Sequence, residues 1–292
     1  MADIQGENML TVLAPAKINL TLEALAKRPD GFHEVHSVIQ TIKLYDSFSF
    51  KPGKKLVIKC DYTGWLAGES LVSRVAGLLK ETSGYTGGAT IELLKKIPLL
   101  SGLGGDSSDA ATVLLGLNRL WGLALAPGEL ARLASQLGSD VSFFLFGGTA
   151  LLQGRGEIVS PLPSLPHMWV VLVIPPATRS GGKTGLLYSR LKENHYTNGQ
   201  KTEKLVSLLT KGGGVAPDNL FNVFESVAYN IFKGLDGYRQ KFLRAGAASV
   251  HLAGSGPALF TMIKEKAQAE KIYSGLKKQG LEAYLAETLD NI

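Results

Sequence analysis

Apolar positions follow two different periods along the chain, and the period predicts which segments are strands and which are helices. Short runs rich in apolar and β-branched residues predict several strands in the first hundred residues. These strands cover 9–13, 18–22, 38–42, 56–60 and 90–94. Between 71 and 79 the apolar residues recur at helical spacing instead. The first part of the chain therefore predicts a sheet accompanied by helix.

The strongest helical pattern follows a glycine-rich segment. Its apolar stripe has the spacing i, i+3, i+4, i+7, i+10 and i+11 and consists of Ala110, Val113, Leu114, Leu117, Leu120 and Trp121. The Asp-Ser-Ser segment at 106–108 precedes it, and these residues are expected as N-caps. A second helix is predicted around 130–137, with Gly138 as its end. Residues 143–152 then predict a strand with a Gly-Gly interruption.

Prolines at 161, 163 and 166 break the pattern and predict a boundary between two domains, 1–163 and 164–292. Beyond the boundary the pattern predicts a strand at 169–174, helices through 220–232, strands at 249–252 and 258–263, a helix at 264–278 and a strand at 281–286. This β-α-β-β-α-β order is typical of the split βαβ arrangement. The expected fold class is α+β.

The glycine-rich segment predicts a phosphate-binding loop. It runs between a predicted strand and the capped helix and consists of Pro98, Leu99, Leu100, Ser101, Gly102, Leu103, Gly104, Gly105, Asp106, Ser107 and Ser108. Three glycines let the backbone approach a ligand closely, and the N–H groups at the helix start favour an anion. A nucleoside triphosphate suits such a loop. Asp106 does not fit a phosphate-binding loop, since a carboxylate repels phosphates. It is expected either to point away as a cap or to help hold Mg²⁺.

A second stretch, 177–184, also resembles a nucleotide-binding loop. It reads Ala-Thr-Arg-Ser-Gly-Gly-Lys-Thr after a buried strand, with alanine in place of the first glycine of the P-loop pattern. No later apolar strand ends in an aspartate suited to Mg²⁺, so this stretch is the weaker candidate for the nucleotide site.

Two charged residues stand in apolar company and form the candidate catalytic pair. Lys17 and Asn19 are two apart on a predicted strand and therefore share a face. Asp140 is expected between a helix end and an apolar strand. The alternative for each is half of a structural salt bridge. As a pair beside a terminal phosphate, Asp140 would accept or orient the proton of the acceptor hydroxyl, and Lys17 would stabilise charge on the transferred oxygens.

Composition and charge narrow the class of protein. The chain has 292 residues, 45% apolar and 19% charged, as in an ordinary globular enzyme. The formal net charge of +6 suits polyanionic ligands, either nucleotides or nucleic acid, although the paired lysines are scattered. Cys60 is the only cysteine, which excludes an intramolecular disulfide and fits a reducing cytoplasm. Neither a signal peptide nor a membrane span is expected.

With these motifs assembled, the chain resembles the GHMP kinases over nearly its whole length. The matching segments are 14–20 (APAKINL), 28–34 (RPDGFHE), 98–111 (PLLSGLGGDSSDAA), 138–145 (GSDVSFFL), 147–148 (GG), 154–157 (GRGE) and 252–260 (LAGSGPALF). The resemblance implies an N-terminal domain like ribosomal protein S5 domain 2 and a ferredoxin-like C-terminal domain. It also implies Lys17 and Asp140 as the catalytic residues. On this resemblance the domain 1–163 would bind ATP and carry catalysis, and the domain 164–292 would bind the acceptor.

The resemblance further implies the substrates. It implies transfer from ATP, with Mg²⁺ as counter-ion and no metal-ligand residue assigned, to the 2-hydroxyl of 4-diphosphocytidyl-2-C-methyl-D-erythritol (CDP-methylerythritol) in the non-mevalonate isoprenoid pathway. His33 would read the cytosine edge, and Phe32 and Tyr188 would stack on the base. The implied acceptor-binding residues are Asn19, Phe32, His33, Thr184, Tyr188, Gly254, Ser255 and Gly256. A monomer or weak homodimer with no nucleic-acid or membrane partner is expected.

Some positions depart from the family pattern, and two alternatives stay open. The family often has Gly or Ser at Asp106, Tyr at Phe32 and Asn at Ser70, and its usual Asn-Asp-x-Glu is Asn-Val-Phe-Glu at 222–225. One alternative is a GHMP kinase for another small acceptor, such as homoserine or mevalonate. The other is a nucleic-acid-binding module with an S5-like fold, which the basic charge would suit.

Overall fold

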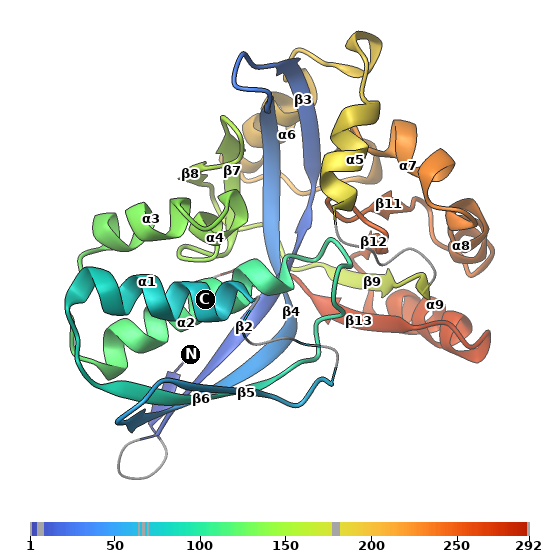
Figure 1. The fold of residues 1–292 in the computed structure, drawn as a ribbon. Helices are drawn as coiled ribbons and strands as arrows, with labels where there is room; N and C mark the ends of the chain where they lie inside the picture. Colours follow the sequence, from blue (N-terminus) through green and yellow to red (C-terminus); the bar gives the residue numbers. More distant parts are fainter. Residues whose placement is uncertain are drawn as a thin grey trace.

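The computed structural model describes residues 2–4, 9–63, 65, 68, 70–176 and 182–290. Within these residues the strands form a nine-stranded sheet and a four-stranded sheet, with helices on their outer faces (Figure 1). The expected two-domain α+β fold is therefore confirmed. Of the stretch at 177–184, residues 177–181 lie outside the described part of the chain.

The first half of the chain builds the larger sheet. Its elements are β1 (Ala2–Ile4), β2 (Leu10–Asn19), β3 (Thr21–Lys27), β4 (His33–Gly53), β5 (Val57–Cys60), α1 (Leu71–Ser83), β6 (Gly88–Leu94), α2 (Gly105–Leu120), α3 (Pro127–Ser135), α4 (Ser139–Phe143), β7 (Thr149–Gln153) and β8 (Ile158–Pro161). The 21-residue β4 organises this sheet, because it pairs along its length with β2, β3, β6 and β7. Figure 1 shows α1 and α2 lying across the sheet near β5 and β6.

The second half of the chain builds the smaller sheet. Its elements are β9 (Trp169–Val173), α5 (Lys183–Arg190), η3 (Glu193–His195), α6 (Gln200–Thr210), η4 (Pro217–Asn219), β10 (Phe221–Asn222), α7 (Glu225–Ile231), α8 (Leu235–Arg244), β11 (His251–Leu252), β12 (Leu259–Ile263), α9 (Lys266–Lys278) and β13 (Ala283–Glu287). The strand order is β11-β12-β9-β13 and every pair is antiparallel. This is the split βαβ order that the sequence predicts.

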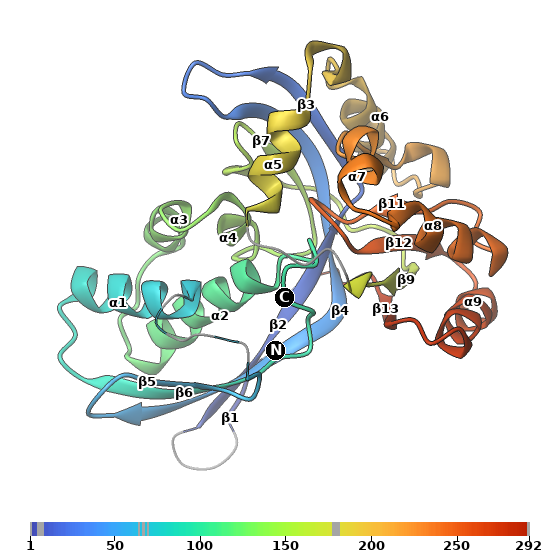
Figure 2. The same ribbon diagram turned by 45° about the vertical axis from the view of Figure 1, so that its right-hand side comes forward.

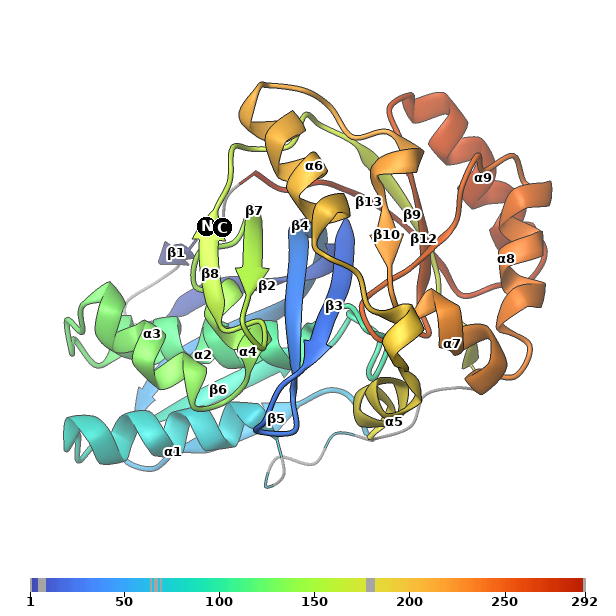
Figure 3. The same cartoon turned by 90° about the horizontal axis from the view of Figure 1, so that it is seen from above.

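Strand β9 is apolar on both faces because both faces are covered. Val171 and Val173 pack with the residues of α8 and α9, whereas Val170 and Leu172 pack with Ile18 and other residues of β2 and β4. Successive side chains of a strand point to opposite faces, so this alternation places the smaller sheet between its own helices and the larger sheet. Figure 3 shows α8 and α9 on the outer side of this arrangement.

The two halves are also joined by backbone pairing. β10 adds to the larger sheet as a parallel neighbour of β3, and an antiparallel bridge links Ile42 to Thr288. The predicted boundary after residue 163 falls in the irregular segment 162–168. Because strands of the second half pair with the first, the division into 1–163 and 164–292 stays a prediction.

Four local predictions were wrong. Helix α3 ends at Ser135 with Gln136 as its C-cap, so Gly138 does not end it and is instead the N-cap of α4. Residues 143–146 are not strand: a short helix, α4, ends at Phe143, and β7 begins only after the turn at 147–148. Asp140 accordingly lies in the first turn of α4 rather than beside a strand. Helix α2 begins at Gly105 with Gly104 as its N-cap, so 106–108 lie inside the first turn and are not the cap. The helical pattern at 220–232 contains β10 before α7 begins at Glu225.

A buried charge cluster lies where β6 runs into the glycine-rich loop. The Nζ of Lys95 lies 2.6 Å from Asp46 Oδ2 and 2.7 Å from Asp109 Oδ2, and all three side chains are almost fully buried. Asp46 Oδ1 also accepts hydrogen bonds from the backbone N–H groups of Lys96 and Ile97. Burial lowers the pKa of Lys95, but Asp109 and Asp46 raise it by more. The lysine therefore stays charged and ties α2 to the strand before the loop.

Replacing Lys95 by alanine is expected to lower the free energy of unfolding by about 3–5 kcal/mol, because two buried carboxylates lose their counter-charge. Lys96→Ala is the control, since the neighbouring side chain is exposed and should change stability by less than about 0.5 kcal/mol. Urea unfolding measures both. Equal stability of the two variants would show that the cluster does not hold the fold.

Candidate active site

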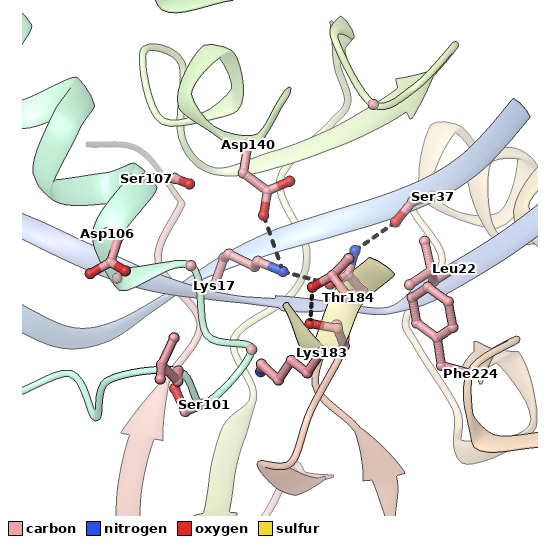
Figure 4. Close-up of a pocket in the computed structure, with 18 of the residues that line it drawn as sticks. Lys17, Leu22, Ser37, Ser101, Asp106, Ser107, Asp140, Lys183, Thr184 and Phe224 are labelled. Carbon is pink, nitrogen blue, oxygen red and sulfur yellow. Dashed lines mark hydrogen bonds and ion pairs between the residues drawn. The ribbon is translucent and has the colours of Figure 1, made fainter. Parts of the chain in front are cut away.

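A cavity of about 260 Å³ opens where the two halves of the chain meet. Its walls come from β2, β4, α4 and the start of α5, together with the glycine-rich loop and the turn at 254–255. Figure 2 shows α5, a helix of the second half, next to the upper strands of the first half, and Figure 4 shows the side chains of the cavity converging from several elements. The cavity therefore gathers residues from both halves of the sequence.

The glycine-rich loop forms one wall and leaves backbone N–H groups open. Gly104 takes φ +74° as the N-cap of α2, and no side chain caps this helix. A Cβ on Gly104 would lie 2.9 Å from Lys17 Cγ, and one on Gly102 would lie 2.2 Å from the carbonyl oxygen of Ala253. Glycine is thus required both for backbone conformation and for close packing. The free N–H groups at the start of α2 form the kind of site that binds phosphate.

Lys17 lies at the centre of the cavity. Its backbone N–H donates to the carbonyl of Leu103 at 2.9 Å, which attaches β2 to the loop. Its Nζ donates to Asn19 Oδ1 at 2.9 Å and lies 3.5 Å from Asp140 Oδ2. Only 6% of the Lys17 side chain is exposed, against 38% of Asp140. The ammonium is therefore fixed in place while the carboxylate still faces the cavity, as Figure 4 shows.

A chain of hydrogen bonds orients Asn19 behind Lys17. The Nδ2 of Asn19 donates to Ser37 Oγ at 2.8 Å, and that hydroxyl donates to the carbonyl of Thr21 at 2.6 Å. All of these groups are buried. Since the amide nitrogen is engaged, its oxygen is presented to Lys17. Sequence reasoning did not find Ser37, because a lone serine in a strand carries no signal.

The turn at 254–256 covers Lys17 from the side of the smaller sheet. A Cβ on Gly254 would lie 2.9 Å from Lys17 Nζ. Asn222 Nδ2 donates to the carbonyl oxygens of Leu252 and Gly254 at 2.9 and 2.8 Å. The Oε1 of Glu225 accepts from the N–H of Leu252 at 2.9 Å. The segment at 222–225 therefore positions the turn that contacts the candidate catalytic lysine.

The described end of the stretch at 177–184 belongs to this same cavity. Lys183 and Thr184 begin α5, and the Thr184 hydroxyl donates to Ser255 Oγ at 2.8 Å. Lys183 donates a hydrogen bond to the carbonyl of Gly256. Sequence reasoning noted Lys183 only as part of a P-loop-like pattern and did not place it in this site.

A second cavity, of about 310 Å³, adjoins the first, and both are lined by Tyr188 and Arg155. The rings of His33 and Tyr188 are stacked at 4.7 Å with an interplanar angle of 20°. Phe32 is 55% exposed, with the guanidinium of Arg155 4.8 Å from its ring centroid. The three residues predicted to hold a base thus line one cavity.

Tyr196 completes this aromatic cavity and was missed in the sequence. Its hydroxyl lies 3.2 Å from His33 Nε2. Burial, with a smaller effect of Lys27, lowers the pKa of His33, so the imidazole is neutral near pH 7. Burial and then Asp140 raise the pKa of Tyr188 to about 12, so the phenol is also neutral. The aromatic cavity therefore offers uncharged rings, which suits a nucleobase.

The fold and the cavity define a class of protein, and matches to two family models agree with it. The family model described as "GHMP kinases N terminal domain" matches residues 70–148, and the one described as "GHMP kinases C terminal" matches residues 208–281. The chain belongs to the GHMP kinase family. Among the described helices, none is long and apolar enough to cross a membrane.

Within that family the chain is similar to proteins of one name. A 4-diphosphocytidyl-2-C-methyl-D-erythritol kinase of Dehalococcoides mccartyi is 48% identical, over 96% of this chain and 99% of the relative. One of Geobacillus thermodenitrificans is 39% identical, over 92% and 93%. A crystal structure of 4-(cytidine 5'-diphospho)-2C-methyl-D-erythritol kinase matches with TM-score 0.81 and 32% identity, over 95% and 98% of the two chains. The homoserine kinase of Cytophaga hutchinsonii, at 20% identity and TM-score 0.75 over 99% and 97%, shares the fold.

Gly104→Ala is expected to lower kcat/KM for ATP by about 10²-fold, because the added methyl displaces Lys17 and the loop by roughly an ångström. Gly84→Ala is the matched control: Gly84 also has positive φ, +67°, but nothing lies within 4 Å of a Cβ placed there. Gly84→Ala should lose about 1 kcal/mol of stability through its positive φ, and Gly104→Ala should lose more, because its methyl also meets Lys17 and Phe144. Steady-state kinetics and thermal unfolding separate the two effects. Equal kinetics of the two variants would contradict the role of the close approach.

Proposed function

We propose that the protein transfers the γ-phosphoryl group of ATP to the 2-hydroxyl of CDP-methylerythritol, a step of the non-mevalonate isoprenoid pathway. The observation that carries this proposal is the junction of two cavities. One holds the Lys17–Asp140 pair and the glycine-rich loop, and the other holds the neutral rings of His33 and Tyr188. The names of the relatives at 48% and 39% identity support it.

The aromatic cavity would bind the cytosine of the acceptor. Phe32 offers an exposed ring face for stacking, which would give affinity without reading the base. One face of the Tyr188 ring is covered by His33, so Tyr188 could stack on a base only with its other face. The neutral imidazole of His33 has one donor and one acceptor nitrogen, and the edge of cytosine also presents both kinds of group. An acceptor without a base would leave these rings without a ligand. The aromatic cavity therefore favours CDP-methylerythritol over a small acceptor such as homoserine or mevalonate.

The other cavity would carry out the transfer. The open N–H groups of the glycine-rich loop would bind the ATP phosphates, and Lys17 would stabilise charge on the oxygens of the phosphoryl group in transit. Asp140, as the more exposed member of the pair, can accept a hydrogen bond from the acceptor hydroxyl. The hydroxyl oxygen then attacks phosphorus, its proton passes toward Asp140, and ADP leaves. A buried cation that is already fixed needs no reorganisation as this charge develops.

Mg²⁺ is proposed as the counter-ion of ATP. Among the described residues no group of three or more acidic, histidine or cysteine side chains could hold a metal alone, so phosphate oxygens would supply most ligands. The Ser108 hydroxyl is buried without a hydrogen-bond partner in the first turn of α2, and Asp106 of that turn lines the cavity. These two oxygens are the protein groups that would hold the ion. An ion held there would neutralise phosphate charge and would offset the repulsion from Asp106.

The division of labour between 1–163 and 164–292 is part of the same proposal. The glycine-rich loop, Lys17 and Asp140 belong to the first segment, and Lys183, Tyr188 and the turn at 254–256 belong to the second. The assignment is not strict, because His33 of the first segment lines the cavity proposed for the base.

ADP release, coupled to a second enzyme, tests the substrate. CDP-methylerythritol, homoserine, mevalonate and shikimate are offered as acceptors at equal concentration. Turnover is expected only with CDP-methylerythritol. Turnover confined to an acceptor without a cytidine group would refute the substrate and leave the kinase class. A salt-dependent shift of an oligonucleotide without turnover would instead favour the nucleic-acid-binding alternative.

Asp140→Asn is expected to lower kcat by at least about 10²-fold, because the amide cannot take the hydroxyl proton. Asp236→Asn makes the same chemical change on exposed α8 and should leave kcat unaltered. The assay is single-turnover ADP formation, with the thermal midpoint of unfolding as the check on folding. A near-normal kcat for Asp140→Asn would reduce the carboxylate to a structural partner of Lys17.

A further inference from the structure

Lys183 is a second buried ammonium in the active-site cavity, and the proposed mechanism does not use it. The residue is only 7% exposed and lines the same cavity as Lys17 and Asp140. Its Nζ donates to the backbone carbonyl of Gly256, and among the described residues it forms no ion pair. Burying a cation without a counter-charge is costly. Such a group is expected where a ligand brings the missing negative charge.

The charges around Lys183 support this reading. The charged residues that line the cavity are Lys17, Lys95, Asp106, Asp140, Arg155 and Lys183. Lys95 is already engaged by two buried aspartates, and Lys17 is paired with Asp140. Arg155 lies near Glu157, and Asp106 supplies a further negative charge but forms no ion pair with Lys183. Among the described residues Lys183 therefore has no anionic side-chain partner of its own. Burial, and then the nearby charge of Lys17, lower the pKa of Lys183 to about 7.

The position of Lys183 indicates which anion it would meet. It is the first residue of α5, and Tyr188 of the aromatic cavity follows five residues later, which is about 7.5 Å along a helix. Figure 4 shows the Lys183 side chain running from α5 toward the loop that carries Ser101. The carbonyl that it contacts belongs to Gly256, whose backbone nitrogen lies 2.8 Å from a Cβ placed on Gly102. Lys183 thus lies between the proposed base site and the glycine-rich loop.

We propose that Lys183 binds phosphate oxygens of a substrate held in this cavity. The inference rests on the proposed function for the identity of the substrates. Two of their groups have this chemistry, the diphosphate of the acceptor and the γ-phosphate of ATP. The acceptor is favoured, because a nucleoside diphosphate with its base against His33 and Tyr188 would extend along α5 to Lys183.

Phosphate binding at Lys183 is expected to change the protonation of the lysine side chain. An anion favours the charged lysine, so its pKa rises above 7 when phosphate is bound. Below pH 7 the free lysine is already protonated and binding takes up no proton. Above pH 7 the free lysine is increasingly neutral, so binding takes up a proton and affinity falls as pH rises. Of the other titratable groups that face the cavity, Tyr188 stays protonated in this range.

Isothermal titration at pH 8 in two buffers of different ionisation enthalpy tests the proposal. The titrants are CDP-methylerythritol and a non-hydrolysable ATP analogue, and the proteins are wild type, Lys183→Met, Lys183→Arg and Lys192→Met. The wild type should take up a proton on binding the acceptor. Lys183→Met should bind it at least about tenfold more weakly, without proton uptake. Lys183→Arg should keep more affinity and lose the uptake, because a guanidinium stays charged. Lys192→Met, at an exposed lysine just beyond α5, should match the wild type.

Each result of these titrations either supports or overturns phosphate binding by Lys183. Weakening and proton uptake confined to the ATP analogue assign Lys183 to the γ-phosphate. Wild-type affinity of Lys183→Met for both ligands overturns the proposal. If that variant does not fold, the absence of proton uptake by the wild type with either ligand overturns it instead. A wild type that neither binds nor phosphorylates CDP-methylerythritol contradicts the proposed function, and the ATP-analogue titration then decides on Lys183 alone.

Discussion

The structure depends on one constraint: the Lys17 ammonium is buried and must be held by partners from distant parts of the chain. Asn19 holds it from its own strand, Asp140 comes from α4, and glycines at 104 and 254 leave the space that the side chain fills. Only the contact with Asn19 is local in the sequence. The need to satisfy one buried charge therefore fixes the positions of the loop, the short helix and the turn of the smaller sheet around a common point.

Three lysines near that point are buried, and each has a different role. Lys95 is enclosed by two aspartates and is a structural tie beneath the loop. Lys17 has a carboxylate partner that remains open to the cavity, so the pair can engage a ligand without being separated. Lys183 has only a backbone carbonyl among the described residues. Burial alone does not distinguish these roles, whereas the number and exposure of the anionic partners does.

The sequence predicted most strands, the α2 stripe, the split βαβ order and the glycine-rich loop, because each follows from a local period or from clustered glycines. It failed at α4. The apolar residues at 143–146 predicted a strand, whereas Asp140 is presented by a helix of only five residues, which is too short to show a helical period. It also missed Ser37, Tyr196 and Lys183. Tyr196 lies 163 residues from His33 in sequence, and no local pattern records such a contact. Contacts between residues that are distant in the sequence could be predicted only from the family resemblance, or could not be predicted.

The proposed function assigns the transfer of the phosphoryl group and the choice of acceptor to two adjoining cavities. Lys17, Asp140 and the loop surround one cavity, whereas His33, Tyr188 and Tyr196 surround the next, and α5 runs between them. A homoserine kinase shares this fold at 20% identity, so the fold by itself does not select an acceptor. Under the proposed function, side chains on the turn at 29–33 and on 183–196 would select the acceptor instead. Because Lys183 and Tyr188 share one short helix, the proposed base site and phosphate site would be linked, and a correctly bound base would place the rest of the acceptor against Asp140.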